Sequence, residues 1–204
     1  MPSDVQTSYS KRAEEYTTLF GSMESVHPSD VQLVTAWAGQ IDGPILDAGC
    51  GPGHWTGYLA EKGHDSRGVD HVRAFIAHAR EVHPGVPFDV GSIDVLPDAP
   101  GSLGGVLAWY SLIHHKPATI ARPLGEFARV LRPGGGLLLG FFTGPAVEPF
   151  EHAVVGAYRW PPEVLAEEVR RAGFEVVEIH TRTGAAPKPR PHGAILARLR
   201  VTGR

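Results

Sequence analysis

Two hydrophobic periodicities alternate along this chain. Short apolar runs, each suited to a buried strand, are separated by segments in which apolar residues recur every three or four positions, as on one face of a helix. The predicted strands cover residues 44–47, a run ending at 70, 87–90, 106–110 and 137–142. The predicted helices cover residues 54–62 and the segments around 72–79, 120–131 and 161–172. Strands that alternate with helices predict an α/β fold with a parallel sheet.

Both ends of the chain carry further predicted elements. Aromatic residues recur at three- and four-residue steps from Tyr9 through Tyr16 to Phe20, which gives a helical segment one aromatic face. Turn and capping residues at 27–30 start a second helix, which ends at Gly39. Near the other end, two β-rich runs flank a segment rich in proline and glycine: residues 174–181 and 194–201.

The stretch 45–53, Ile-Leu-Asp-Ala-Gly-Cys-Gly-Pro-Gly, has the order strand, tight turn, helix. Glycines serve where a turn needs positive φ and where the backbone must approach a ligand. The stretch departs from the dinucleotide fingerprint G-x-G-x-x-G, because His54 takes the place of the third glycine and Asp47 precedes the first by two residues. A carboxylate there repels a pyrophosphate and attracts an ammonium group. The loop therefore favours a ligand that carries an amine.

A second acidic residue, Asp70, ends the next short apolar run. A carboxylate at this place in such a sheet accepts hydrogen bonds from ribose hydroxyls. An amine together with a ribose is the chemistry of S-adenosylmethionine. The two aspartates therefore predict that cofactor, rather than a nicotinamide dinucleotide.

Four motifs in order, 47–53, 68–70, 91–94 and 130–135, resemble those of class I S-adenosylmethionine-dependent methyltransferases, of the type that acts on small molecules in bacteria. The resemblance covers nearly the whole chain. It implies an α/β, Rossmann-like sheet of seven mostly parallel strands, flanked by helices and closed by an antiparallel terminal hairpin strand. It also implies a division of one domain into three parts: a helical lid at 1–40, a cofactor-binding core at 44–143, and a substrate-side loop, last helix and hairpin at 144–204.

The same resemblance assigns the cofactor's contacts, with S-adenosylhomocysteine as the product. Asp47 is expected to hold the amino end, mostly through neighbours or water, above the glycine turn. Asp70, with His71 nearby, is expected to hold the ribose, and residues 92–94 form the adenine turn. The full set of expected cofactor residues is Tyr16, Asp47, Gly49, Cys50, Gly51, Trp55, Asp70, His71, Ser92, Ile93, Asp94, Trp109, Tyr110 and Ser111.

Candidate catalytic residues are His114 and His115, which follow the predicted strand 106–110. In the resembled family this position borders the methyl group and the acceptor, and an imidazole with a pKa near 6.5 can act as a general base. Plain packing is the alternative. Adjacent side chains diverge, so we expect only one of the two to face the substrate. Tyr9, from the lid, is the third candidate, and no metal is predicted because adjacent histidines lack the i, i+4 spacing of a helical metal site.

The loop after the strand at 137–142 is expected to cover the acceptor, and its aromatic and basic residues suggest a planar aromatic or heteroaromatic small molecule methylated on oxygen or nitrogen. The expected acceptor residues, with packing as the alternative for each, are Phe142, His152, Tyr158 and Arg159. The proline-rich segment near 187–191 is either a stiff loop or a source of contacts to an anionic substrate. The residues proposed for such contacts are Arg182, Lys188, Arg190 and His192.

Composition and charge narrow the classes of protein and of partner that fit the sequence. A chain of 204 residues with 42% hydrophobic and 20% charged residues fits one globular domain. A net charge of −3 disfavours nucleic acid as a partner. The single cysteine, Cys50, cannot form an internal disulfide, and no apolar run approaches eighteen residues. We therefore expect a cytoplasmic protein with a small-molecule acceptor and no membrane partner. The sequence is compatible with either a monomer or a homodimer.

Two rival functions remain at this stage. One is a nicotinamide-dependent oxidoreductase, which Asp47 and the missing third glycine argue against. The other is a non-catalytic module that binds S-adenosylmethionine without turnover.

Overall fold

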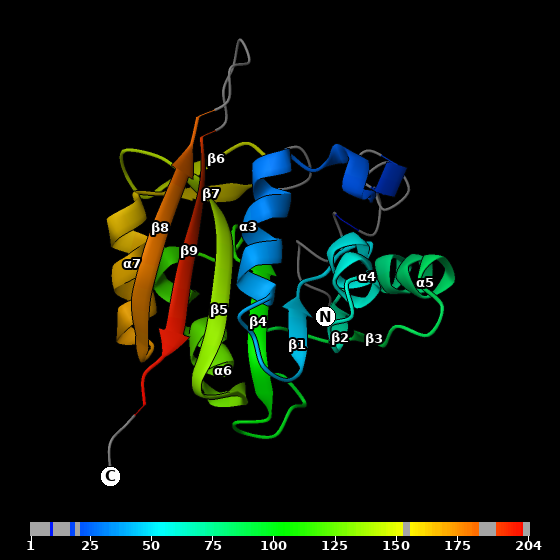
Figure 1. The fold of residues 1–204 in the computed structure, drawn as a ribbon. Coiled ribbons are helices and arrows are strands. Elements are labelled where there is room, and N and C mark those ends of the chain that lie inside the picture. Colours follow the sequence, from blue (N-terminus) through cyan, green and yellow to red (C-terminus); the bar gives the residue numbers. More distant parts are fainter. Residues whose placement is uncertain (1–8, 10–16, 19–20, 153–155, 184–190, 202–204) are drawn as a thin grey trace.

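The computed structural model describes residues 9, 17–18, 21–152, 156–183 and 191–201. One twisted sheet runs through the molecule, with helices on both faces (Figure 1). Its parallel strands follow the order β3 (Phe88–Val90), β2 (Ser66–Asp70), β1 (Ile45–Ala48), β4 (Leu103–Trp109) and β5 (Leu131–Thr143). Beyond β5 lie two antiparallel strands, β9 (His192–Leu199) and then β8 (Phe174–Arg182). The expected parallel α/β sheet with an antiparallel terminal hairpin is confirmed.

The helices divide between the two faces of the sheet. One face carries α3 (Pro28–Ala38), α4 (His54–Glu61) and α5 (Arg73–Val82). The other carries α6 (Ala121–Val130) and α7 (Pro162–Arg171). Short 3₁₀ helices cover Met23–Ser25 and Pro117–Thr119.

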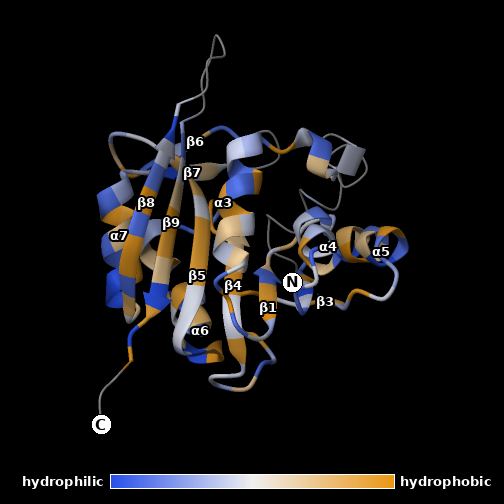
Figure 2. Ribbon diagram, in the orientation of Figure 1, coloured by the Kyte–Doolittle hydropathy of each residue, from blue (hydrophilic) through white to orange (hydrophobic). Residues whose placement is uncertain are grey.

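Neighbouring residues of each central strand pack into different cores, because successive side chains point to opposite faces. Ile45, in β1, packs with Val34 and Trp37 of α3. The next residue, Leu46, belongs to the core that Phe127 of α6 and Val169 of α7 complete. Burial on both faces explains why these strands read as continuous apolar runs, and Figure 2 shows the hydrophobic colouring concentrated along them.

Nine strands form the sheet in the described part of the chain, whereas seven were expected. The segment expected to be an irregular loop forms a small antiparallel hairpin, β6 (Glu148–Phe150) and β7 (Ala157–Trp160). β7 pairs with Phe142 and Thr143 of β5, beyond Gly140, where the pairing of β4 with β5 ends. Because β9 already occupies the other edge of β5 at Phe142, β7 extends the sheet in line with β4.

The topology brings the predicted motifs to one edge of the sheet. The glycine loop follows β1, Asp70 ends β2, and the turn at 91–94 follows β3. Tyr110 follows β4 at the same edge. Parallel strands share the direction of their carboxyl ends, and β1 lies between β2 and β4, where ligands bind in open α/β sheets.

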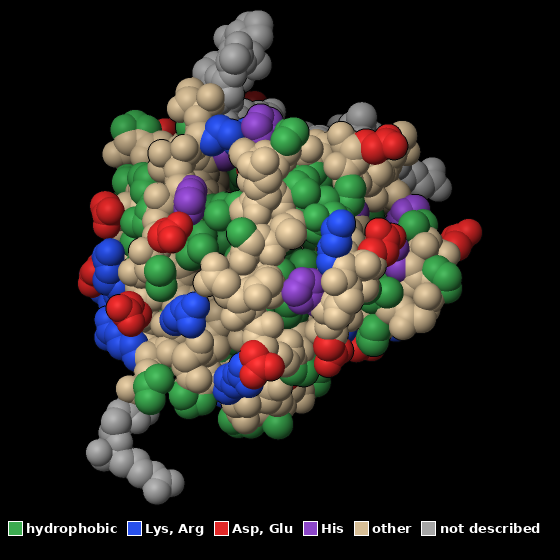
Figure 3. All heavy atoms as spheres, in the orientation of Figure 1, with side chains coloured by type: hydrophobic (Ala, Val, Ile, Leu, Met, Phe, Trp, Pro, Cys, Tyr) green, Lys and Arg blue, Asp and Glu red, His purple; other side chains and the backbone are tan. Residues whose placement is uncertain are grey.

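The surface shows mixed charge. On the face drawn in Figure 3, Lys and Arg side chains are scattered among Asp and Glu side chains. None of the helices in the described part of the chain combines the length and apolar character that crossing a bilayer requires.

Candidate active site

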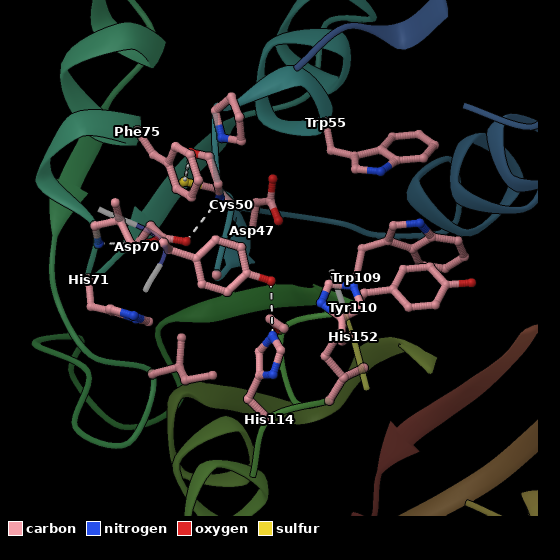
Figure 4. Close-up of a pocket in the computed structure, with 18 of the residues that line it drawn as sticks. Asp47, Cys50, Trp55, Asp70, His71, Phe75, Trp109, Tyr110, His114 and His152 are labelled. Atoms are coloured by element: carbon pink, nitrogen blue, oxygen red, sulfur yellow. Dashed lines mark hydrogen bonds between the residues drawn. The ribbon is translucent and has the colours of Figure 1, made fainter. Parts of the chain in front are cut away.

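A cavity of about 830 Å³ opens along this carboxyl edge, within the size range of small-molecule sites. Every predicted site residue in the described part of the chain lines it, except Tyr158 and Arg159. Tyr16, Lys188 and Arg190 lie outside the described residues. Figure 4 shows Asp70 and His71 on one side of the cavity, Trp55, Trp109 and Tyr110 on the other, and His114 and His152 below.

The glycine loop is shaped by two different constraints. Gly49 has φ 78°, and a Cβ there would lie 2.4 Å from the Cβ of Ser111, so the loop packs tightly against the end of β4. Gly51 has φ 54°, yet a Cβ there would meet no atom within 4 Å. Since Gly51 lines the cavity, its missing side chain leaves the backbone open to a ligand.

Two carboxyl groups are buried behind this loop. Asp47 is 2% exposed, and Thr56 Oγ1 donates a hydrogen bond to its Oδ2 at 2.7 Å. Burial raises the pKa of Asp47 to about 7, and the nearby Asp70 adds to the rise. The pKa of Asp70 is also raised by burial, against the hydrogen bonds that its oxygens accept from Val72 N–H at 2.8 Å and Gly51 N–H at 3.0 Å. Asp70 thus fixes the glycine loop while its remaining lone pairs can accept from a ligand.

Hydrogen bonds with three residues distant in sequence give the adjacent histidines different environments. His115 Nε2 lies 3.0 Å from Asp94 Oδ1, so this ring belongs to the turn after β3. His114 Nδ1 lies 3.0 Å from the carbonyl oxygen of Gly156, and its Nε2 lies 2.9 Å from the hydroxyl of Tyr9. Both rings line the cavity, but their hydrogen-bond partners come from different segments of the chain.

The tautomer of His114 follows from its partners. A carbonyl oxygen only accepts, so Nδ1 carries the proton and Nε2 presents its lone pair to the Tyr9 O–H. Burial lowers the pKa of His114, which keeps the ring neutral at pH 7. His114 therefore has the protonation state of a general base, with its basic nitrogen at the cavity wall.

Aromatic rings enclose the rest of the cavity. The ring of Trp55 meets that of Trp109 edge-on at 5.9 Å, and Tyr110 meets Phe142 at 5.0 Å. Tyr110 has φ 58°, the one positive φ among the described residues other than glycine. Such a backbone conformation is strained and is characteristic of functional sites.

Tyr158 and Arg159 were expected in the acceptor pocket, but they do not line the cavity. Both belong to β7 and make their contacts outside the cavity. Tyr158 packs against the core beneath the sheet, and its N–H donates to the carbonyl oxygen of Ile113 at 2.8 Å. The Arg159 guanidinium lies over the ring of Phe150, 4.5 Å from its centroid.

Two residues connected with the site were not predicted from the sequence. Thr56, the buried partner of Asp47, lies in a predicted helix, and Asp30, which lines the cavity, lies at a predicted helix start. Thr56 could have been noticed as a polar residue on the buried side of a predicted helix, whereas the sequence around Asp30 indicates only a helix start.

Solved structures share this fold over nearly its full length. The 1,6-didemethyltoxoflavin N1-methyltransferase of Burkholderia thailandensis, solved with 1,6-didemethyltoxoflavin and S-adenosylhomocysteine bound, is 21% identical, with a TM-score of 0.75 over 98% of this chain and 92% of that chain. The [4+2]-cyclase SpnF is 19% identical, with a TM-score of 0.79 over 97% of this chain and 96% of that chain. A family model described as a methyltransferase domain matches residues 45–135. Residues 45–135 of this chain therefore match the methyltransferase domain family, and the chain shares the fold of class I S-adenosylmethionine-dependent methyltransferases.

A curated relative agrees with the family assignment. The demethylmenaquinone methyltransferase of Beutenbergia cavernae is 34% identical over 114 residues, which cover 56% of this chain and 46% of that protein. The chain spans less than two thirds of the length of this relative and of the others that it matches.

The cavity fits the cofactor of this family. Gly51 leaves room where the loop approaches a ligand, and the buried Asp47 suits an ammonium group. Ser111 Oγ and Trp55 Nε1 are buried at the cavity wall without a hydrogen-bond partner in the described part of the chain. Buried polar atoms of this kind are normally satisfied, so a polar ligand suits the site.

The raised pKa of Asp47 leads to a prediction about stability. A carboxyl group with a pKa of about 3.9 unfolded and about 7 folded contributes stability below pH 4 that is lost as the pH rises through 7. We expect Asp47→Asn to unfold less readily than the wild type at about pH 8, by up to about 4 kcal/mol, with the difference shrinking toward pH 4. Asparagine keeps an oxygen for Thr56.

Urea denaturation across this pH range measures the difference, with the exposed Asp89→Asn as the matched control. A difference that does not change with pH would mean that Asp47 titrates as an ordinary carboxyl group.

Proposed function

We propose that the protein transfers the methyl group of S-adenosylmethionine to an oxygen or nitrogen atom of a small molecule. The observation that carries the proposal is the neutral His114 with its basic Nε2 at the wall of the cavity that also holds the glycine loop and the buried aspartates. A cofactor loop alone indicates binding. A positioned base in the same cavity supports turnover.

The bound cofactor supplies a methyl group on a sulfonium, which is already a good electrophile. The protein's task is to align the acceptor with the methyl–sulfur bond and to exclude water. In this proposal Asp47 holds the amino end, Asp70 the ribose, and Asp94 the adenine amine. The rings of Trp55 and Trp109 line the same cavity.

The acceptor loses a proton as the new bond forms. His114 Nε2 takes this proton, either directly or through Tyr9, whose hydroxyl passes its own proton to Nε2 as it receives the acceptor's. The Gly156 carbonyl oxygen stabilises the imidazolium through Nδ1–H. The residues 1–40 act as a lid in this proposal, because Tyr9 contacts both His114 and Phe75.

The acceptor is proposed to be a planar aromatic or heteroaromatic molecule. Phe142 and His152 line the cavity, and their ring centroids lie 5.9 Å apart. The similar proteins named above are themselves named for demethylmenaquinone and 1,6-didemethyltoxoflavin, which supports a small molecule as the acceptor here.

Calorimetric titration of S-adenosylmethionine and S-adenosylhomocysteine tests the cofactor assignment. We expect micromolar binding, weakened at least about tenfold in Asp70→Ala because the ribose contacts and the anchor of Gly51 are lost together. Asp89→Ala, an exposed carboxylate outside the cavity, should bind as the wild type does.

The same titration separates the rivals. Binding of neither ligand, with binding of a nicotinamide dinucleotide instead, would overturn the proposal in favour of an oxidoreductase. Binding without formation of S-adenosylhomocysteine across a broad acceptor panel would support a non-catalytic module. The fold itself permits other outcomes, since one similar structure is named as a cyclase.

A further inference from the structure

An ion pair lines the cavity at its far end. Arg182, the last residue of β8, donates from Nη2 to both carboxylate oxygens of Asp30, in the first turn of α3, at 2.8 Å and 3.0 Å. Both side chains are partly buried, 26% and 17% exposed. The two residues are 152 positions apart in sequence, so the contact exists only in the folded chain.

The ion pair lies away from the three aspartates assigned to the cofactor. Asp47, Asp70 and Asp94 lie at or just after the ends of β1, β2 and β3, whereas Arg182 ends β8 at the opposite side of the sheet. The order β2-β1-β4-β5-β9-β8 places five strand spacings, about 24 Å, between Asp70 and Arg182. The part of the cavity near Arg182 is therefore available to the acceptor.

The Arg182 guanidinium has N–H donors that the contact with Asp30 does not use. Among the described residues, the hydrogen bonds of its guanidinium all leave from Nη2, so Nε and Nη1 make none. A guanidinium normally binds a carboxylate through two parallel N–H donors on different nitrogens. Asp30 thus holds Arg182 in place through one nitrogen and leaves the fork geometry unused.

Aromatic side chains line the cavity near the Arg182 guanidinium. His192 pairs with Arg182 across the β8–β9 hairpin, and its Nδ1 lies 2.6 Å from the Tyr110 hydroxyl. The ring of Phe142 lies 5.5 Å from that of His192 and 5.0 Å from that of Tyr110. The acceptor end therefore combines a guanidinium with aromatic rings.

We propose that the acceptor is an aromatic carboxylate, whose ring lies among Tyr110, Phe142 and His192 and whose carboxylate binds Arg182 in place of Asp30. The proposal rests on the proposed methyl transfer, because it identifies the rest of the cavity as the acceptor site. Asp30 shows which chemical group suits this position, because its carboxylate already lies against Arg182. Lys116, the other Lys or Arg side chain at the described cavity wall, follows His115 and belongs to the adenine end.

Matched probe pairs test the charge requirement. In protein saturated with S-adenosylhomocysteine, calorimetry compares 4-hydroxybenzoate, 3-hydroxy-2-naphthoate and indole-2-carboxylate with their carboxamides. At least one carboxylate should bind about tenfold more tightly than its amide, as expected for a charge-assisted contact. Arg182→Gln should abolish this preference, while Arg171→Gln, an exposed arginine of α7, should preserve it.

Asp30→Asn should change probe affinity in the opposite direction from Arg182→Gln, which separates recognition by Arg182 from a purely structural role of the ion pair. Without the internal carboxylate, Arg182 should bind the probe severalfold more tightly. If the ion pair were only structural, its loss would weaken binding in both variants. Thermal melts show whether each variant is folded. Equal binding of acid and amide in all three pairs, absence of binding by any probe, or a preference that survives Arg182→Gln would overturn the inference. Failure of S-adenosylhomocysteine itself to bind would instead overturn the proposed function, and the inference with it.

Discussion

Replacement of His114 by glutamine is expected to lower kcat for methyl transfer by about 100-fold to 10,000-fold, the usual contribution of a positioned general base. Glutamine can still donate to the Gly156 carbonyl oxygen and meet the Tyr9 hydroxyl, but it cannot take a proton. Affinity for S-adenosylhomocysteine should stay close to that of the wild type. Formation of S-adenosylhomocysteine with the best acceptor of the panel measures the effect.

The pH profile distinguishes a base from a packing residue. Because burial lowers the pKa of His114, wild-type kcat/KM should fall only below about pH 6.5, and this limb should disappear in His114→Gln. His180→Gln, an exposed histidine of β8 outside the cavity, is the matched control. A kcat within threefold of the wild type in His114→Gln would show that the acceptor needs no base.

Sequence patterns predicted the central architecture because their determinants are local. The run of apolar residues into Asp47, the glycines after it and the helical stripe from Trp55 each constrain only a few neighbours. Sheet topology then follows from the order of such units, since parallel strands joined by helices share one carboxyl edge. For this reason the position of Asp70 beside the glycine loop was predictable, although its hydrogen bond to Gly51 N–H was not.

Contacts between distant segments determine the chemistry of the site, and periodicity carries no information about them. Tyr9 and His114 are 105 residues apart, and only their contact reveals which histidine has a basic nitrogen in the cavity. Asp30 and Arg182 are similarly remote. Arg182 was a candidate for an anionic substrate, but its partner was not foreseen.

The segment after β5 shows how predicting a loop where the chain forms a strand leads to wrong predictions of side-chain direction. Treated as an irregular loop, residues 144–160 leave every aromatic and basic side chain free to face the acceptor. As a strand paired with β5, β7 fixes the direction of each side chain, and Tyr158 and Arg159 make their contacts outside the cavity, with the core and with Phe150. His152, which precedes that strand, reaches the cavity and meets the His114 ring at 5.4 Å between centroids.

Gly51→Ala is expected to weaken binding of S-adenosylmethionine by about 100-fold or more while the protein stays folded. A Cβ at Gly51 meets no protein atom within 4 Å, so the added methyl group projects into the open cavity where the loop approaches the ligand. Its cost to folding is the left-handed strain at φ 54°, about 1–2 kcal/mol. Calorimetry for binding and urea denaturation for stability measure the two effects separately.

Two other glycines make the prediction specific. Gly63→Ala adds a similar strain, at φ 88°, with nothing within 4 Å and outside the cavity, so it should lose similar stability and retain cofactor binding. Gly49→Ala places its methyl group against Ser111 and should prevent stable folding. If Gly51→Ala bound the cofactor as tightly as Gly63→Ala, the ligand would not approach this loop, and the assignment of the methionine end to the glycine turn would be wrong.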